Sequence, residues 1–429
     1  MAFWVHLATA RRPDTIAIEG PERSLTYAEL SAAAIEAARA LHDLGVHGGD
    51  RVALALPPGE DFVIALHGCI LAGAAAVPVD LRHSEQERAR RMAGATAVVS
   101  EPLRADGRLF PTTAGPATAT LAVMHTSGTT SDPKPVALTR ANFQASALGS
   151  AVALGLDLEE RWLCPMPLTH VGGLSIPIRC AIYATTAVLH GRFDTERVLT
   201  ELMDPGRRIT IVSLVPTMLA RLLDAGLESP PTLRWALLGG GPLPVALLER
   251  AQQAGVPVAP TYGMTEACSQ IATFGLPLPG VELQISGTGE ILVRGAIVSP
   301  GAAGEDGWLH TGDLGRLDDD GRLVITGRKS DTIITGGENV APTEVEDVLA
   351  AHPAVADAGV HARPDPEWGE AIVAAVVLRD GQRVSERELQ EHCAARLARF
   401  KVPKEVRFVS ELPRTGSGKL LRRHLTGTV

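Results

Sequence analysis

The sequence is poor in aromatic residues, since Phe, Trp and Tyr together make up only 4% of its 429 residues. Hydrophobic residues nevertheless account for 45% of the chain, so its cores must consist largely of aliphatic side chains. A chain of this length is long enough for two or three domains, each of which can bury a core of its own.

Cysteine is also scarce. The five cysteines stand far apart, with no C-x-x-C pair and no histidine at the spacing of a zinc ligand. This pattern argues against a zinc cluster and predicts buried thiols in a reducing compartment. The cysteines are Cys69, Cys164, Cys180, Cys268 and Cys393.

No stretch reaches the roughly 18 uninterrupted apolar residues that a membrane-spanning helix needs. The N-terminal segment also lacks the basic region and long apolar core of a signal peptide. We therefore expect a cytoplasmic protein without a membrane span. The net charge of -9 gives no reason to expect nucleic acid as a partner.

The end of the chain departs from this acidic balance. From Arg383 onward there are eleven Lys and Arg residues against five Glu. Such a basic segment is usually a solvated face, but it also suits a small polyanionic ligand. Both interpretations stay open at this point.

A Ser/Thr-rich loop follows the apolar run Leu121–Met124, and the stretch 126–139 has the sequence T-S-G-T-T-S-D-P-K-P-V-A-L-T. Gly128 permits a tight turn, the hydroxyl residues supply donors, and Lys134 supplies a positive charge. A loop of this composition can surround phosphate oxygens. A plain surface turn is the commoner explanation of such a cluster.

Hydrophobic periodicity predicts an α/β protein. Strand, glycine-bearing loop and helix alternate, which favours parallel-rich sheets with ligands at the carboxyl ends of the strands. Short alternating strands beyond Pro277 predict a small β-barrel or meander. We therefore expect a large N-terminal αβ domain with a small β-barrel (residues 1–328) and a small mobile α+β domain (residues 329–429).

Seven motifs occur in order along nearly the whole chain, and each of them alone has low specificity. They are T-S-G-T-T-S-D-P-K (126–134), L-G-G-G-P-L (238–243), Y-G-M-T-E (262–266), T-G-D (311–313), G-R-K-S-D (327–331), G-G-E-N-V-A-P-T-E-V-E (336–346) and P-R-T-G-S-G-K (413–419). The ordered set resembles the adenylate-forming superfamily of acyl-CoA synthetases, adenylation domains and luciferases.

The resemblance implies an enzyme that uses ATP, Mg²⁺ and coenzyme A. Such an enzyme joins a carboxylate to AMP with loss of pyrophosphate, and a thiol then displaces AMP. Phosphates are expected at the 126–134 loop, through Thr126, Ser127, Gly128, Thr129, Thr130 and Lys134. The adenine is expected between the Tyr262 ring and the backbone of Gly240, Gly241 and Pro242, with Gly263 and Met264 beside it.

The same resemblance assigns the reacting groups. Thr265 is expected to bond the α-phosphate, and Glu266 to ligate Mg²⁺, an ion that prefers oxygen ligands. Asp313 is expected to accept bonds from the ribose hydroxyls, with Arg328 nearby as a donor. The resemblance also implies that Lys419 bridges carboxylate and α-phosphate. A Walker A loop is excluded there, because Pro413 and Leu420 break that pattern.

The segment Gly327–Asp331 resembles the hinge on which the C-terminal domain of the superfamily rotates between half-reactions. Many members carry Asp two residues after the arginine, whereas this chain has Ser330. A pivot is a property of the backbone, so we expect the rotation to persist. Gly336 and Gly337 would then line the channel for the pantetheine arm of coenzyme A.

Four stretches (167–175, 179–190, 237–244 and 261–271) resemble the o-succinylbenzoate–CoA ligases of menaquinone biosynthesis, and the chain is short, as in that branch. The acid brings a ring and two carboxylates, and a buried unpaired carboxylate is costly. Arg179 is the candidate partner, although its head group reaching solvent or forming a structural pair is an equal alternative. The other candidate substrate residues are His170 at the pocket mouth, Gly239, Ser269 and Gln270.

Other functions stay open. The acid could be a different aromatic carboxylic acid of the benzoate or aminobenzoate type, or the enzyme could be a stand-alone adenylation enzyme that loads a carrier protein. A nucleotide-binding regulator with a degenerate site is the alternative outside the enzymes. A homodimer is among the assemblies that the sequence leaves open.

Overall fold

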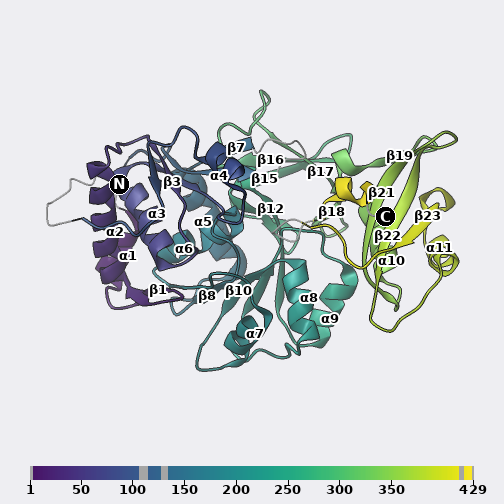
Figure 1. Cartoon of the computed structure of the whole chain (residues 1–429), viewed down its shortest axis with the longest axis horizontal. Coiled ribbons are helices and arrows are strands. Elements are labelled where there is room, and N and C mark those ends of the chain that lie inside the picture. The colour runs from purple at the N-terminus through teal and green to yellow at the C-terminus, as the bar shows by residue number, and fades with distance from the viewer. Residues whose placement is uncertain (1–2, 106–114, 127–133, 415–419, 428–429) are drawn as a thin grey trace.

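The computed structural model describes residues 3–105, 115–126, 134–414 and 420–427, and the strands in these ranges form four sheets (Figure 1). The first sheet has the order β5-β3-β4-β6-β7. Its strands β5, β3, β4 and β6 are parallel, and β7 closes one edge antiparallel to β6. The bounds are Arg51–Leu54 (β3), Ala75–Pro78 (β4), Ala97–Val99 (β5), Thr120–Thr126 (β6) and Lys134–Thr139 (β7).

The second sheet has nine strands in the order β14-β13-β12-β11-β10-β8-β9-β1-β2. Its six inner strands, from β12 to β1, are parallel. The bounds are Ile16–Glu19 (β1), Ser24–Thr26 (β2), Arg161–Cys164 (β8), Thr186–Leu189 (β9), Ile211–Leu214 (β10), Trp235–Leu238 (β11), Val258–Met264 (β12), Ser269–Thr273 (β13) and Leu276–Pro277 (β14).

Helices connect the parallel strands, and their first turns show why they begin where they do. The Thr26 side chain accepts from the Glu29 amide while the Glu29 carboxylate accepts from the Thr26 amide, a capping box that starts α2. Thr139 and Asn142 start α5 in the same way. The helices of this part are Trp4–Arg11 (α1), Tyr27–Asp43 (α2), Glu60–Ala72 (α3), Glu85–Met92 (α4), Arg140–Leu154 (α5), Val171–Tyr183 (α6), Thr195–Met203 (α7), Pro216–Asp224 (α8) and Val245–Gln253 (α9).

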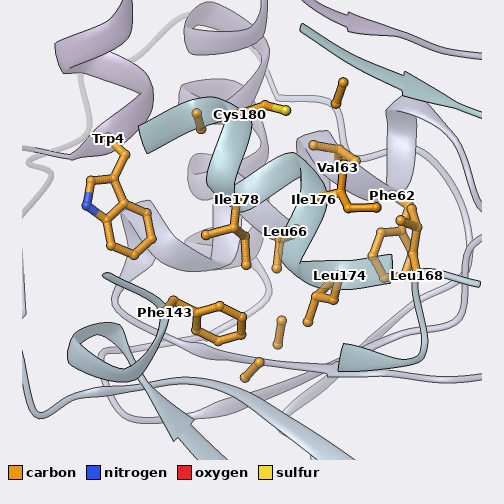
Figure 2. Packing of buried hydrophobic residues seen from close by; sticks show 14 of the residues in the cluster. Trp4, Phe62, Val63, Leu66, Phe143, Leu168, Leu174, Ile176, Ile178 and Cys180 are labelled. Atoms are coloured by element: carbon orange, nitrogen blue, oxygen red, sulfur yellow. The ribbon is translucent and has the colours of Figure 1, made fainter. Parts of the chain in front are cut away.

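The largest hydrophobic core surrounds α6. Figure 2 shows Ile176 and Ile178 of this helix among side chains of other helices, including Leu66 of α3 and Phe143 of α5. These side chains are fully or almost fully buried. Leu, Ile, Val and Ala supply most of this core, as the low aromatic content predicts.

Two further sheets follow in the chain. Strands β15 (Val281–Ile285), β16 (Glu290–Gly295), β17 (Leu309–Leu317) and β18 (Leu323–Arg328) form an antiparallel meander. The last sheet has the order β20-β19-β22-β21, with β23 beside β22. Its elements are Ile333–Thr335 (β19), Glu338–Val340 (β20), Pro342–Ala350 (α10), Val355–Asp365 (β21), Gly369–Leu378 (β22), Glu386–Ala394 (α11) and Glu405–Phe408 (β23).

The predicted α/β fold class is therefore confirmed, with the β-meander between the parallel sheets and the C-terminal α+β unit. The last two sheets are joined by a short 3₁₀ turn, η2 (Lys329–Asp331). The boundary at residue 328 between two independently moving domains stays a prediction. All five cysteines are free and buried, as expected. None of the helices in the described ranges has the length and apolar character needed to cross a bilayer.

The His67 imidazole in α3 is buried, and its Nε2 atom has no hydrogen-bond partner among the described residues. Burial lowers its pKa from 6.5 to about 4. Between these two pKa values the unfolded chain takes up a proton that the folded chain rejects, so acidification destabilises the fold.

Acidification from pH 7 to pH 5 lowers the free energy of unfolding of the wild type. We expect this decrease to be about 2 kcal/mol smaller in His67→Leu, which lacks the imidazole. Urea unfolding followed by tryptophan fluorescence at both pH values measures this difference. Equal pH dependence of the two proteins would contradict the assignment.

Candidate active site

The candidate site lies at the carboxyl ends of the parallel strands of the nine-stranded sheet, where ligands bind in open α/β sheets. The loop Gly239–Pro242 follows β11, and the short turn η1 (Thr265–Ala267) follows β12. Two of its glycines are required sterically. A Cβ atom on Gly239 would lie 2.8 Å from the Thr261 carbonyl oxygen, and one on Gly263 would lie 1.6 Å from the Ser269 carbonyl oxygen.

Three residues expected at the nucleoside are in direct contact. The Tyr262 hydroxyl donates to Asp313 Oδ2 at 2.9 Å, and Arg328 Nε donates to Asp313 Oδ1 at 2.7 Å. Asp313 and Arg328 are opposite each other in the register of β17 and β18. Burial, followed by the Asp313 carboxylate, raises the pKa of Tyr262 well above its usual value, so the phenol remains a donor. The sequence predicted these residues separately but not their hydrogen bonds.

A second acidic residue, Glu290 of β16, is buried beside this group. Its carboxylate accepts from the Gly312 amide at 3.1 Å and from Lys329 Nζ at 3.1 Å. Lys329 belongs to η2, in the predicted hinge segment, so this pair links the hinge to the β-meander. Sequence reasoning missed Glu290.

Thr265 and Glu266 occupy η1, and both are partly exposed. The Glu266 carbonyl accepts from the Ser299 amide at 2.8 Å, which fixes the turn. Within the described ranges no group of three or more His, Cys, Asp or Glu residues is arranged as a metal cage. Mg²⁺ at nucleotides is usually held by one or two carboxylates together with phosphate oxygens, so a single carboxylate at Glu266 fits the predicted ion.

The two ends of the predicted phosphate loop lie side by side. Thr126 ends β6, Lys134 begins β7, and the two residues are paired across the antiparallel strands. Ser127, Gly128, Thr129 and Thr130 lie outside the described residues, and so does Lys419. Their predicted roles therefore rest on the sequence alone.

His170 is the residue before α6, at the amino end of that helix. Burial lowers the pKa of its imidazole, so the ring is neutral at neutral pH. The neighbouring Thr169 hydroxyl lies 3.5 Å from Asp80 Oδ2, and Asp80 pairs with Arg82. Asp80 and Arg82 follow β4 at the carboxyl edge of its sheet, a position that marks them in the sequence although we did not single them out.

Arg179 lies nine residues further along in sequence, near the carboxyl end of α6, and is only 2% exposed. Its Nη2 donates to Ser146 Oγ at 3.0 Å, while its Nε has no partner among the described residues. Its guanidinium lies 5.7 Å from the Trp162 ring centroid. Its head group therefore does not reach solvent. Its pair is the Ser146 hydroxyl, and no carboxylate in the described ranges bonds it.

The Arg179 head group is connected to the start of β13. The Ser146 hydroxyl, to which it donates, donates in turn to the Cys268 carbonyl at 2.8 Å. Cys268 and Ser269 both have left-handed backbone conformations, with φ of 50° and 89°. Such strained conformations in residues other than glycine concentrate at functional sites, and no sequence pattern predicts this one.

The amide of Gln270 is already engaged. Its Nε2 donates to Thr273 Oγ1 at 3.0 Å and lies 3.4 Å from Thr261 Oγ1, which leaves only Oε1 without a partner among the described residues. The predicted contact of Gln270 with the substrate stays a prediction, and through Oε1 it can only be that of an acceptor.

Gly336 and Gly337 form the two-residue turn between β19 and β20, with φ of 60° and 84°. Positive φ at both positions is the geometry that favours glycine in tight hairpins. The Gly336 amide donates to the Trp368 carbonyl at 2.8 Å, and a Cβ atom there would lie 3.0 Å from the Trp368 ring. Their role at the pantetheine channel stays a prediction.

Comparison with known proteins identifies the class. The family described as AMP-binding enzyme matches residues 5–302, and the family described as AMP-binding enzyme C-terminal domain matches residues 344–419. The chain belongs to the AMP-binding enzymes, which confirms the predicted superfamily.

Within this class the chain is similar to the 2-succinylbenzoate–CoA ligase of Bacillus licheniformis, with 39% identity over 98% of each chain. It is also similar to o-succinylbenzoate CoA synthetase of Bacillus subtilis in complex with the acyl-adenylate intermediate OSB-AMP, with a TM-score of 0.92, 37% identity, and coverage of 99% of this chain and 98% of that chain. A structure of the same relative with ATP and magnesium ion has a TM-score of 0.90 at 37% identity and covers 99% of both chains.

A double mutant of the same Bacillus subtilis relative, bound with its product analogue OSB-NCoA, gives a TM-score of only 0.73. The identity of 37% and the coverage of 99% and 98% equal those of the OSB-AMP complex. The overall structure of this chain is thus closer to that of the acyl-adenylate complex than to that of the product-analogue complex.

We expect Asp313→Ala to raise the KM for ATP about 10- to 100-fold, because one or two charge-assisted hydrogen bonds to a nucleoside are worth roughly 1.5–3 kcal/mol. Initial rates against ATP concentration measure the effect. Glu282→Ala, which removes an exposed carboxylate paired with Arg294, is the matched control and should leave this KM unchanged. An unaltered KM in Asp313→Ala would contradict the assignment of Asp313 to the nucleoside.

Proposed function

We propose that the protein is an ATP-dependent 2-succinylbenzoate–CoA ligase of menaquinone biosynthesis. The observation that supports this assignment best is the buried Arg179, which has no described acid partner and lies one hydrogen-bonded residue away from the strained turn at Ser269. A substrate with two carboxylates supplies the missing anion. Relatives of this activity match the chain over nearly its full length.

In the first half-reaction an oxygen of the succinyl carboxylate attacks the α-phosphorus of ATP. A phosphorus–oxygen bond to the acid forms, and the bond to the departing pyrophosphate breaks. Both reactants are anions, so the site has to neutralise charge and hold the groups in line. We assign this task to Lys419, Thr265 and the loop that begins at Thr126 and ends at Lys134.

The nucleoside is held by the group around Asp313. We assign the ribose hydroxyls to its carboxylate, which the Arg328 guanidinium orients through its hydrogen bond to Oδ1. Tyr262 is fixed by its hydroxyl bond to the same carboxylate, so its ring is oriented before adenine binds. Pre-organisation of this kind lowers the entropic cost of binding. Glu266 would hold Mg²⁺, which supplies positive charge to the phosphate oxygens when bound.

The second carboxylate of the acid, on the ring, is assigned to Arg179. A desolvated guanidinium without an anion is costly, and a buried ion pair offsets much of that cost. The Nε of Arg179 has no partner among the described residues, and together with the Nη atoms it presents the planar fork that suits a carboxylate. We assign His170, neutral and at the amino end of α6, to the mouth of the pocket, with Gly239 and Ser269 in its wall.

In the second half-reaction the thiol sulfur of coenzyme A attacks the acyl carbon, a thioester forms, and AMP leaves. We propose that the C-terminal unit rotates at Ser330 between the two steps, and that Gly336 and Gly337 then line the pantetheine channel. A cytoplasmic location and a homodimeric assembly complete the proposal. Analytical ultracentrifugation measures the assembly.

A substrate panel tests the acid. We expect rapid pyrophosphate release with 2-succinylbenzoate and much slower release with 4-oxo-4-phenylbutanoate, which lacks the ring carboxylate. Arg179→Leu should raise the KM for 2-succinylbenzoate by about 100-fold, the scale of one buried charge pair, and should reduce the preference between the two acids.

Preference of the wild type for simple benzoates, or an unchanged preference in a folded Arg179→Leu variant, would contradict the proposed substrate. Mass spectrometry of the product with coenzyme A present and carrier protein absent separates a CoA ligase from an enzyme that loads a carrier.

We expect Lys419→Ala to lose adenylate formation by about 100- to 1,000-fold, because a pre-organised charge at the reacting group is worth roughly 3–4 kcal/mol. The same variant should still convert supplied acyl-adenylate and coenzyme A to thioester. Single-turnover assays of each half-reaction measure this split, and equal losses in both would show that Lys419 has a different role.

A further inference from the structure

The described residues on the two sides of the gap at 415–419 are joined to each other. Arg414 and Leu420 form an antiparallel β-bridge, and the Leu421 amide donates to the Pro413 carbonyl at 2.9 Å. We call these four residues the base. In the sequence, Lys419 directly precedes Leu420 of the base.

This base is fixed to the sheet of the C-terminal unit. Leu420 packs in a small apolar cluster with Leu412 and Leu425. A Cβ atom on Gly359 of β21 would lie 3.1 Å from the Leu420 side chain, so the strand and this residue are in close contact. Arg414 Nη2 donates to Asp357 Oδ2, also on β21, at 2.6 Å.

Arg422, two residues beyond Leu420, connects this base to other elements. Its two terminal nitrogens both bond the Glu346 carboxylate of α10, the Nη2 bond measuring 2.9 Å. Its Nη1 also donates to the Val360 carbonyl at 3.0 Å, and its Nε donates to Asp331 Oδ2 at 3.1 Å. The Arg422 side chain is only 16% exposed. A two-pronged bond to one carboxylate with a third bond to another fixes the plane of a guanidinium.

Asp331 is the last residue of η2, the predicted hinge turn, and Lys329 of the same turn bonds Glu290 in the β-meander. A continuous series of contacts thus leads from the meander through the hinge turn to Arg422, which is three residues from Lys419. We propose that Arg422 is a positioning residue for the adenylation step, because it ties the chain that directly follows Lys419 in sequence to the hinge turn. This inference rests on the proposed function.

A positioning role and a merely structural one have different consequences. An arginine that only stabilises the C-terminal unit affects both half-reactions alike, because both need that unit folded. An arginine that places Lys419 affects the step in which the lysine meets the reacting phosphate, and a misplacement of about 1 Å can cost about 100-fold there. The ratio of the two half-reaction rates is therefore the decisive quantity.

We expect Arg422→Gln to slow adenylate formation about 10- to 100-fold, with the KM for ATP nearly unchanged, and to leave thioester formation from supplied acyl-adenylate within about threefold of the wild type. Arg422→Lys keeps the charge but not the planar fork, so it should recover only part of the rate. The matched control is Arg363→Gln, which breaks a half-exposed pair with Glu405 in the same unit and should leave both rates unchanged.

Asp331→Asn provides a second test that leaves Arg422 and its bonds to Glu346 in place. It should slow adenylation in the same direction but less, with an unchanged melting temperature. Each rate is measured with the acid that the wild type adenylates fastest. If the proposed substrate is wrong, only the substrate panel of the wild type shows it, and the comparison of the variants remains valid. Equal losses in both half-reactions, or a wild-type rate of adenylation in Arg422→Gln, would overturn the inference.

Discussion

The close pairing of β12 with β13 at Gly263 is the constraint on which the site depends. The Ser269 carbonyl occupies the space where any side chain at residue 263 would begin. Gly263 lies between Tyr262, which precedes it in the chain, and Thr265 and Glu266, which follow it. The close approach of the backbones at Gly263 therefore fixes the positions of all three residues. The return strand carries Ser269 and Gln270. One pair of strands thus fixes groups assigned to the nucleoside, the phosphate, the metal ion and the acid.

Much of this was predictable from the sequence, for a physical reason. Loops that bind phosphates and nucleosides need glycine where backbones approach closely and hydroxyl groups where oxygens must be bonded. The composition of Gly239–Pro242 and of the 126–134 loop therefore identifies both as candidate binding loops in the sequence. The order of strands and helices follows from hydrophobic periodicity, and it predicted the fold class. The branch of the superfamily was likewise indicated by local runs such as 261–271.

The remaining features arise from contacts between residues distant in sequence. Whether Arg179 pairs with an acid depends on the residues that α5 and β13 contribute around it. The sequence of α6 alone cannot predict those neighbours. The bond between Tyr262 and Asp313 joins two sheets. Gln270 looked free to contact a substrate, but Thr261 and Thr273 engage its amide nitrogen. The place of Asp80 and Arg82 directly after a strand is visible in the sequence, but the contact of Asp80 with Thr169 is not.

The scarcity of aromatic residues has a practical consequence for Trp368, which packs against the Gly336 turn. The chain has five tryptophans, and Trp368 is the only one beyond residue 328. Its indole lies 4.4 Å from the Lys404 ammonium and in contact with the predicted pantetheine turn. With the other four tryptophans replaced, its emission would be a built-in optical reporter of the C-terminal unit alone, with no attached dye to disturb its surface.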